Sequence, residues 1–102
     1  HPTLFLFDEP FAAVDEITRQ RLNDELMRLF TLEGFAAIYI THSISEACYV
    51  ASRVIVMSDR PARIVAEVPI PFEYPRPESL RYEPEFVERA GEVSELLRSA
   101  GT

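Results

Sequence analysis

The stretch Leu4-Phe5-Leu6-Phe7-Asp8-Glu9-Pro10 decides the fold class, because an apolar run stops abruptly at two consecutive carboxylates. A short apolar run without alternation is typical of a strand that is buried on both faces of a parallel sheet. Residues Phe35 to Ile40 repeat this pattern and end at Thr41-His42. Ligands of parallel α/β sheets bind outside the carboxyl ends of the strands. We therefore expect the polar residues that follow both strands to lie together at one edge.

A helix is predicted between these two strands, from Glu16 to Leu32. Asp15 can cap its N-terminus, and Gly34 supplies a C-terminal stop. Apolar residues recur close to the helical period and predict a packed face; they are Ile17, Leu22, Leu26, Leu29 and Phe30. The resulting β-α-β unit is expected to be right-handed, with its two strands parallel.

The rest of the chain predicts a second helix, a hairpin and a third helix. Ser43 and Glu46 have capping-box spacing, and their helix is expected to reach about Ala51. Strands are predicted at Arg53–Met57 and at Arg63–Val68, joined through turn residues at 58–61 into a hairpin.

Four prolines make residues 69–83 an extended connector, and Pro84 suits the first turn of a last helix. The chain is thus predicted to be an α/β protein, with a core at 1–68 and a Pro-rich connector and helix at 69–102.

Composition narrows the function. The 102 residues carry a net charge of −7, which argues against a nucleic-acid or anionic-membrane surface. The single cysteine, Cys48, excludes an internal disulfide framework and is expected to be a buried structural thiol. The arginines are scattered, so we expect most of them to be ordinary surface charges. Because the sequence begins with His1 rather than Met, we expect the natural chain to start further upstream.

The candidate chemistry lies at the two strand ends. One carboxylate of Asp8 and Glu9 could support Mg²⁺ while the other polarises an attacking water. His42 could donate to a phosphate oxygen or hold that water. Each residue also has a plainer interpretation, a solvated Asp-Glu pair and a histidine satisfied near a helix N-terminus. Asp15 is a helix cap, a functional loop residue, or both.

Phosphate-binding machinery of the P-loop type is absent from this sequence. It contains no G-x-x-x-x-G-K-[ST] motif and no lysine at all.

Taken together, three segments resemble the C-terminal part of an ABC-transporter ATPase subunit. Residues Leu4–Pro10 are similar to the Walker B strand with its catalytic glutamate, and Phe11–Asp15 to the D-loop. Residues Ile40–Ala47 are similar to the segment of the switch histidine. Residues Ala51–Ser58 and Arg60–Ile64 resemble the nitrate/sulfonate/taurine-type importers. The sequence departs from the pattern at Ala12, Val14 and Ser43, where Gly, Leu and Asp are frequent.

This resemblance implies a fold, cofactors and roles. The fold would be the C-terminal part of a P-loop NTPase (RecA-like) parallel sheet, with residues 1–68 as a partial ATPase core. The complete subunit would bind ATP and Mg²⁺. Asp8 would support the metal, Glu9 would act as general base, His42 would contact the γ-phosphate, and Asp15 would couple two sites across a dimer.

The resemblance also implies partners and a location. A second ATPase subunit would bind head to tail, and membrane permease subunits would receive the work of hydrolysis. The protein would be peripheral, at the cytoplasmic face of the inner or plasma membrane. Since the Walker A loop and the LSGGQ signature are not in this sequence, the isolated chain is expected to be inactive.

Two alternatives stay open at the level of sequence. The chain could be a non-catalytic interaction module derived from an ABC ATPase. It could instead be an unrelated α/β phosphate-binding or signalling domain that uses Asp8 and Glu9 for a metal.

Overall fold

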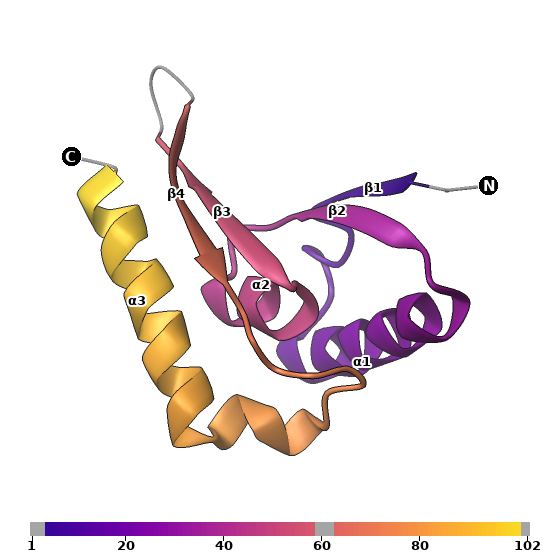
Figure 1. The fold of residues 1–102 in the computed structure, drawn as a ribbon. Coiled ribbons are helices and arrows are strands. Elements are labelled where there is room, and N and C mark those ends of the chain that lie inside the picture. Colours follow the sequence, from indigo (N-terminus) through magenta and orange to yellow (C-terminus); the bar gives the residue numbers. More distant parts are fainter. Residues whose placement is uncertain (1–3, 59–62, 101–102) are drawn as a thin grey trace.

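The computed structural model describes residues 4–58 and 63–100 and shows an α/β chain (Figure 1). The turn expected at residues 58–61 lies, apart from Ser58, outside the described residues. The elements follow the predicted order: β1 (Leu4–Asp8), α1 (Glu16–Glu33), β2 (Ala36–Ile40), α2 (Ile44–Val50), β3 (Arg53–Met57), β4 (Ile64–Pro69), the 3₁₀ helix η1 (Glu78–Tyr82) and α3 (Pro84–Ala100).

The helix boundaries follow from local chemistry. The Asp15 carboxylate accepts the backbone N–H of Thr18 at 3.1 Å at the start of α1, and Ser43 Oγ accepts that of Glu46 at 3.3 Å at the start of α2. Gly34 ends α1 with a φ of 72°, a left-handed conformation that glycine adopts without steric cost. These three predicted signals are confirmed.

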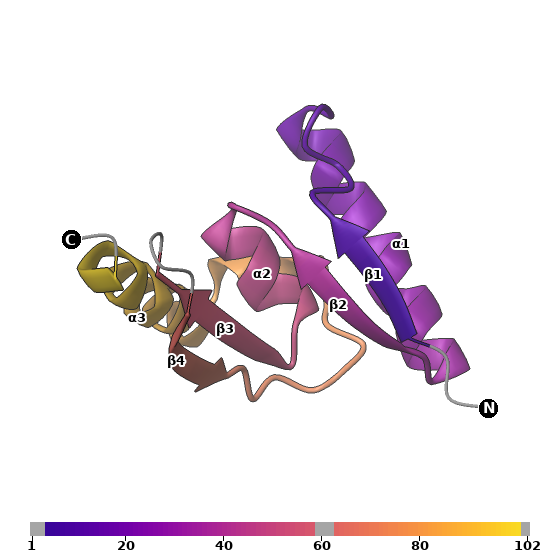
Figure 2. The same ribbon diagram turned by 90° about the horizontal axis from the view of Figure 1, so that it is seen from above.

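The strands form two separate two-stranded sheets. β1 and β2 are parallel, in register from Leu4 opposite Ala36 to Asp8 opposite Ile40. β3 and β4 form the predicted antiparallel hairpin, with an irregularity at Val56/Met57. Within the described ranges no hydrogen-bonded ladder joins the two sheets. Figure 2 shows the β1–β2 pair with α1 on one side of the molecule and the hairpin with α3 on the other.

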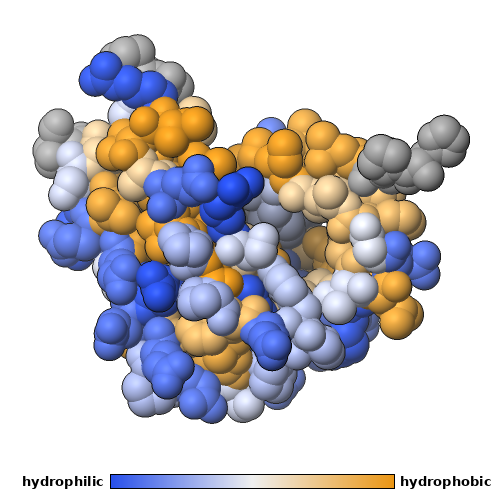
Figure 3. Space-filling model, in the orientation of Figure 1, coloured by the Kyte–Doolittle hydropathy of each residue, from blue (hydrophilic) through white to orange (hydrophobic). Residues whose placement is uncertain are grey.

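The expectation that β1 and β2 are buried on both faces is wrong. Leu4 and Leu6 are 65% and 66% exposed, and Ile38 is 52% exposed. The reason is that α1 covers one face only. Phe5 and Phe7 pack against Phe30 of α1, at ring centroid distances of 5.2 and 5.8 Å, whereas the alternate leucines point the other way. Figure 3 shows the resulting apolar surface along the upper side of the molecule.

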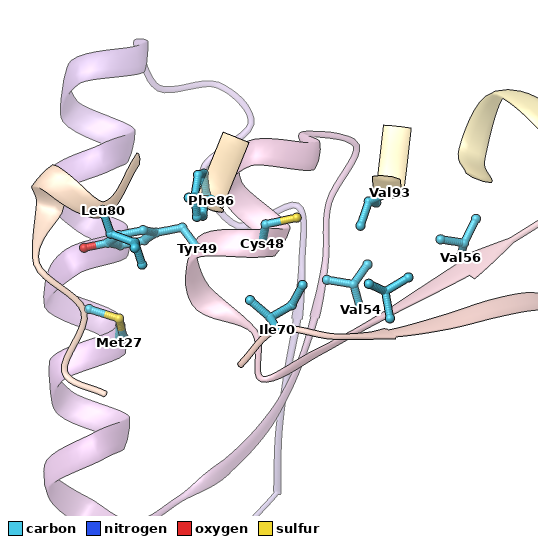
Figure 4. Close-up of a cluster of buried hydrophobic side chains, with 10 residues drawn as sticks. Met27, Cys48, Tyr49, Val54, Val56, Ile70, Leu80, Phe86 and Val93 are labelled. Atoms are coloured by element: carbon cyan, nitrogen blue, oxygen red, sulfur yellow. The ribbon is translucent and has the colours of Figure 1, made fainter. Parts of the chain in front are cut away.

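Most of the buried core lies in the elements that follow β2 (Figure 4). Nine of its ten members come from α2, the hairpin, the connector, η1 and α3, and Met27 comes from α1; the ten are Met27, Cys48, Tyr49, Val54, Val56, Val68, Ile70, Leu80, Phe86 and Val93. Cys48 is fully buried, as expected of a structural thiol, and burial raises its pKa to about 11. The core thus takes side chains from both sides of residue 68, and the domain boundary placed there stays a prediction.

The apolar face predicted for α1 is only partly correct. Ile17 and Leu29 are 67% and 50% exposed, while the buried positions of the helix include Asn23 and Asp24. Both polar residues have partners on neighbouring elements. Asn23 bonds the Glu46 carboxylate of α2, and Asp24 forms an ion pair with Arg81 of η1 at 3.2 Å. The helix therefore packs on the second half of the chain through satisfied polar groups rather than through leucines alone.

The side chains of two arginines, Arg76 and Arg81, are buried, whereas the sequence predicts surface positions for most of the arginines. Arg76 is 3% exposed, and its guanidinium donates to five backbone carbonyl groups, those of Cys48, Tyr49, Ala51, Ile70 and Phe72. Arg81 lies over the Tyr49 ring at 3.7 Å. The connector is consequently clamped to α2, and it contains the short helix η1 instead of being extended throughout.

Candidate functional site

The site begins at Glu9, the first residue after β1. Its backbone φ is 51°, a left-handed conformation that is uncommon for a residue with a side chain, and it is the only such non-glycine in the described ranges. The Glu9 N–H donates to Ile40 O at 2.8 Å, which ties the turn to the end of β2. A residue in a sparsely populated backbone conformation persists only where the surrounding structure holds it, and such residues cluster at functional sites.

Glu9 and His42 meet at the carboxyl ends of the two parallel strands. The backbone N–H of His42 donates to Glu9 Oε1 at 2.7 Å, and the distance from His42 Nδ1 to Glu9 Oε2 is 3.2 Å. The imidazole is 92% exposed, whereas the glutamate side chain is 31% exposed. The predicted proximity of these two residues is confirmed, and the far side of the imidazole is free to meet a ligand.

These contacts set the electrostatics of the carboxylate. The hydrogen bond from the His42 side chain, followed by the one from its backbone N–H, lowers the pKa of Glu9 below its usual value of 4.5. Glu9 is therefore ionised at neutral pH.

The other two predicted site residues lie outside this contact. Asp8 is the last residue of β1, exposed and opposite Ile40 in the ladder. Asp15 caps α1, and its bond from the Thr18 N–H lowers its pKa. In residues 4–58 and 63–100 no three His, Cys, Asp or Glu side chains are grouped so that they could hold a metal ion.

A polar cavity of about 280 Å³ opens beside the Glu9–His42 contact. Seven residues line it: Glu9, Ala12, Arg19, Thr41, His42, Ser43 and Glu46. Arg19 was not predicted as a site residue. Its Nη2 donates to Val14 O at 3.2 Å, while its buried Nε has no hydrogen-bond partner in the structure. Its position one turn after the Asp15 cap was the available signal, since that spacing directs it back toward the loop after β1.

A second residue that the sequence reasoning underrated is Glu46. It is 9% exposed, and its carboxylate accepts hydrogen bonds from Asn23 Nδ2 at 2.8 Å and from Thr41 Oγ1. It therefore does not make the side-chain bond to Ser43 N–H that a full capping box implies; that N–H donates to Thr41 Oγ1. Tyr39 joins the network by donating to Asn23 Oδ1 at 2.7 Å, and burial together with the Glu46 carboxylate raises its pKa.

The fold and the site together define a class. A parallel β-α-β unit with a carboxylate and an imidazole at its strand ends has the arrangement of α/β proteins that bind ligands at that edge. No helix within the described ranges is long and apolar enough to cross a membrane.

Comparison with known proteins narrows this class. The chain is 45% identical over 85 residues to a Brucella abortus protein provisionally named as ATP-binding, covering 83% of the chain and 33% of that protein. It is 43% identical over 76 residues to the aliphatic sulfonates import ATP-binding protein SsuB 2 of Pseudomonas syringae, covering 74% and 33%. It is 35% identical over 104 residues to the taurine import ATP-binding protein TauB of Rhizobium johnstonii, covering 97% and 40%.

These relatives identify the chain as a homologue of sulfonate and taurine import ATP-binding proteins, and it belongs to their family, the ABC-transporter ATP-binding subunits. The chain spans about a third of the length of the curated relatives it matches. No family model matches it.

Proposed function

We propose that this chain is part of the ATP-hydrolysing subunit of an ABC importer for nitrate-, sulfonate- or taurine-like solutes. The observation that carries the proposal is the Glu9–His42 contact. It joins, at the ends of two parallel strands, the two residues that match the catalytic glutamate and the switch histidine of the family. The names of two relatives, an aliphatic sulfonates import ATP-binding protein and a taurine import ATP-binding protein, support ATP binding in the import of sulfonate- or taurine-like solutes.

Glu9 acts on the attacking water in this proposal. A carboxylate with a lowered pKa is a weak base. The main contribution of Glu9 is therefore to orient and polarise the water as it attacks the γ-phosphorus. The left-handed backbone at Glu9 and its two bonds from His42 hold the carboxylate in one direction. Preorganisation of this kind is what phosphoryl transfer requires, because positioning and charge stabilisation dominate its catalysis.

His42 and Asp8 serve the phosphates and the metal. When both ring nitrogens carry a proton, the exposed imidazole can donate from Nε2 to an oxygen of the γ-phosphate while its Nδ1 donates to Glu9. Asp8 offers an exposed carboxylate beside Glu9, and Mg²⁺ is usually held by one or two carboxylates together with waters and phosphate oxygens. Asp8 thus fits the donor set of an ATP-bound Mg²⁺, which would neutralise developing charge on the phosphates.

The partners follow from the same proposal. Asp15 lies at the surface before α1, where it can reach a second ATPase subunit in a head-to-tail dimer. Permease subunits would hold the assembly at the cytoplasmic face of the membrane. The β1–β2 pair and β3 would form part of a P-loop NTPase sheet.

A non-catalytic interaction module is the second candidate function. The exposed apolar residues of both sheets favour it, since faces of this kind pair with other chains.

The test compares the isolated chain with a graft. The chain alone should release no phosphate from MgATP. A graft in which this chain replaces the matching third of the Pseudomonas syringae sulfonate import protein should hydrolyse MgATP. Glu9→Gln in this graft should slow hydrolysis roughly 10²–10⁴-fold while ATP binding is retained. Glu67→Gln is the matched control, because Glu67 pairs with Arg53 at 3.1 Å on the hairpin.

If the Glu9→Gln graft hydrolysed ATP at the parent rate, Glu9 would have no role in the mechanism. Turnover of about 1–100 s⁻¹ by the isolated chain would show that this segment is sufficient by itself.

A further inference from the structure

A network of four polar side chains, two of them buried and two half-buried, lies beside the Glu9–His42 contact. Its members come from α1, from β2 and its end, and from α2; they are Asn23, Tyr39, Thr41 and Glu46. No motif of the sequence required these residues to meet, and Asn23 lies 23 positions from Glu46 in the chain.

The network has a fixed direction. Asn23 Nδ2, an amide nitrogen that can only donate, and Thr41 Oγ1 both donate to the Glu46 carboxylate. Tyr39 fixes the orientation of the Asn23 amide by donating to its oxygen. Because the hydroxyl hydrogen of Thr41 points to Glu46, its lone pairs are left to accept the Ser43 N–H at 3.0 Å.

The end of this network flanks the backbone of His42. Thr41 and Ser43, its two neighbours in the chain, are bonded to each other, and Ser43 Oγ accepts the Glu46 N–H. The peptide of His42 therefore has little freedom to rotate, and its own N–H is aimed at Glu9 Oε1.

We propose that Thr41, oriented by Glu46, is a positioning residue that holds the turn presenting His42 to Glu9. The inference rests on the proposed role of the Glu9–His42 pair for its catalytic meaning, but its geometry can be tested without ATP.

Hydrogen exchange at two backbone amides of this chain is the first test. Thr41→Val removes the hydroxyl and keeps the branched shape, so exchange at Ser43 and His42 should accelerate roughly five- to tenfold, the equivalent of one net hydrogen bond. Thr41→Ser keeps the hydroxyl and should leave both rates within about twofold of the parent. Thr31→Val is the matched control, because the Thr31 hydroxyl bonds Met27 O inside α1.

Unchanged exchange in Thr41→Val, or equal acceleration in Thr41→Ser, would overturn the proposal. If Thr41→Val also loses protection in the hairpin, Glu46→Gln replaces it, since this change substitutes a donor for one acceptor oxygen at nearly constant shape. Glu46→Gln must then accelerate exchange at Ser43, or the proposal is wrong.

Kinetics in the graft provide the second test. Thr41→Val should lower kcat several-fold with KM for ATP within about twofold, and Thr41→Ser should restore kcat, because a misplaced His42 affects the transition state more than binding. A graft without any ATPase activity would count against the proposed function alone, since the exchange result still decides whether Thr41 positions His42. A several-fold rise in KM with an unchanged kcat would contradict the positioning role of Thr41.

Discussion

The two halves of the molecule differ in how completely they bury their apolar side chains. The β1–α1–β2 half keeps half or more of Leu4, Leu6 and Ile38 exposed, and it contains the strained Glu9. The second half contributes nine of the ten buried apolar side chains, and it contains the Arg76 guanidinium, which donates to five backbone carbonyl groups. The candidate chemistry therefore lies in the half with the less complete core, which is where segments that move or bind partners are usually found.

Removing the Arg76 clamp is the strongest way to break this contrast. Arg76→Ala should lower the free energy of unfolding by at least about 3 kcal/mol, because several buried carbonyl oxygens lose their donor at a cost of about 1–3 kcal/mol each. Urea unfolding measures the loss. Arg53→Ala is the control, since Arg53 forms an exposed pair worth at most about 1 kcal/mol.

A loss in Arg76→Ala no greater than in Arg53→Ala would show that the carbonyl groups find other donors. The second half would then owe its stability to apolar packing alone.

The exposed apolar faces predict self-association of the isolated chain. The outer leucines of β1 and the free edge of β2 offer a surface and a ladder for another chain. Light scattering should show oligomers or aggregates, and Leu4→Lys with Leu6→Lys should shift the chain toward monomer. Val87→Lys is the control, because Val87 is an apolar residue of α3 that is also more than half exposed.

A monomeric parent with one cooperative thermal transition would contradict this expectation. It would also favour the interaction-module function, because the chain would then fold as one cooperative unit by itself.

The smallest expected effect concerns pH at the site. The pKa of Glu9 is lowered mainly by the His42 side chain, so its carboxyl should titrate below 4.5 by carbon-13 NMR and return toward that value in His42→Ala. Since the folded-state pKa is depressed, the stabilisation from this contact is complete above the ordinary pKa and is lost as the pH falls through the lowered one. An unchanged titration of Glu9 in His42→Ala would show that His42 does not lower the pKa of Glu9.

Local signals predicted the fold well, whereas burial depended on contacts that no local pattern encodes. Asp15, Ser43 and Gly34 act within one helical turn, so the sequence places them correctly. The exposure of Leu6 depends on what covers the second face of the sheet, and the apolar run itself does not predict which element packs there.

The site shows the same division. Glu9 and His42 were predictable because parallel strands bring their carboxyl ends together. The sequence pattern assigned Glu46 a role in capping and a place in the switch-histidine segment, and no pattern singled out Arg76. Each of the two also has partners more than 20 residues away, Asn23 for Glu46 and Cys48 for Arg76, and only the folded chain brings these together.

Helix α2 is anchored at both ends. Its seven residues make a rod about 10 Å long. The first turn is tied through Glu46 to the turn of His42, and the last carbonyl groups are gripped by Arg76 of the connector. The turn that presents His42 and the Pro-rich connector therefore contact opposite ends of the same short helix, although they lie far apart in the sequence.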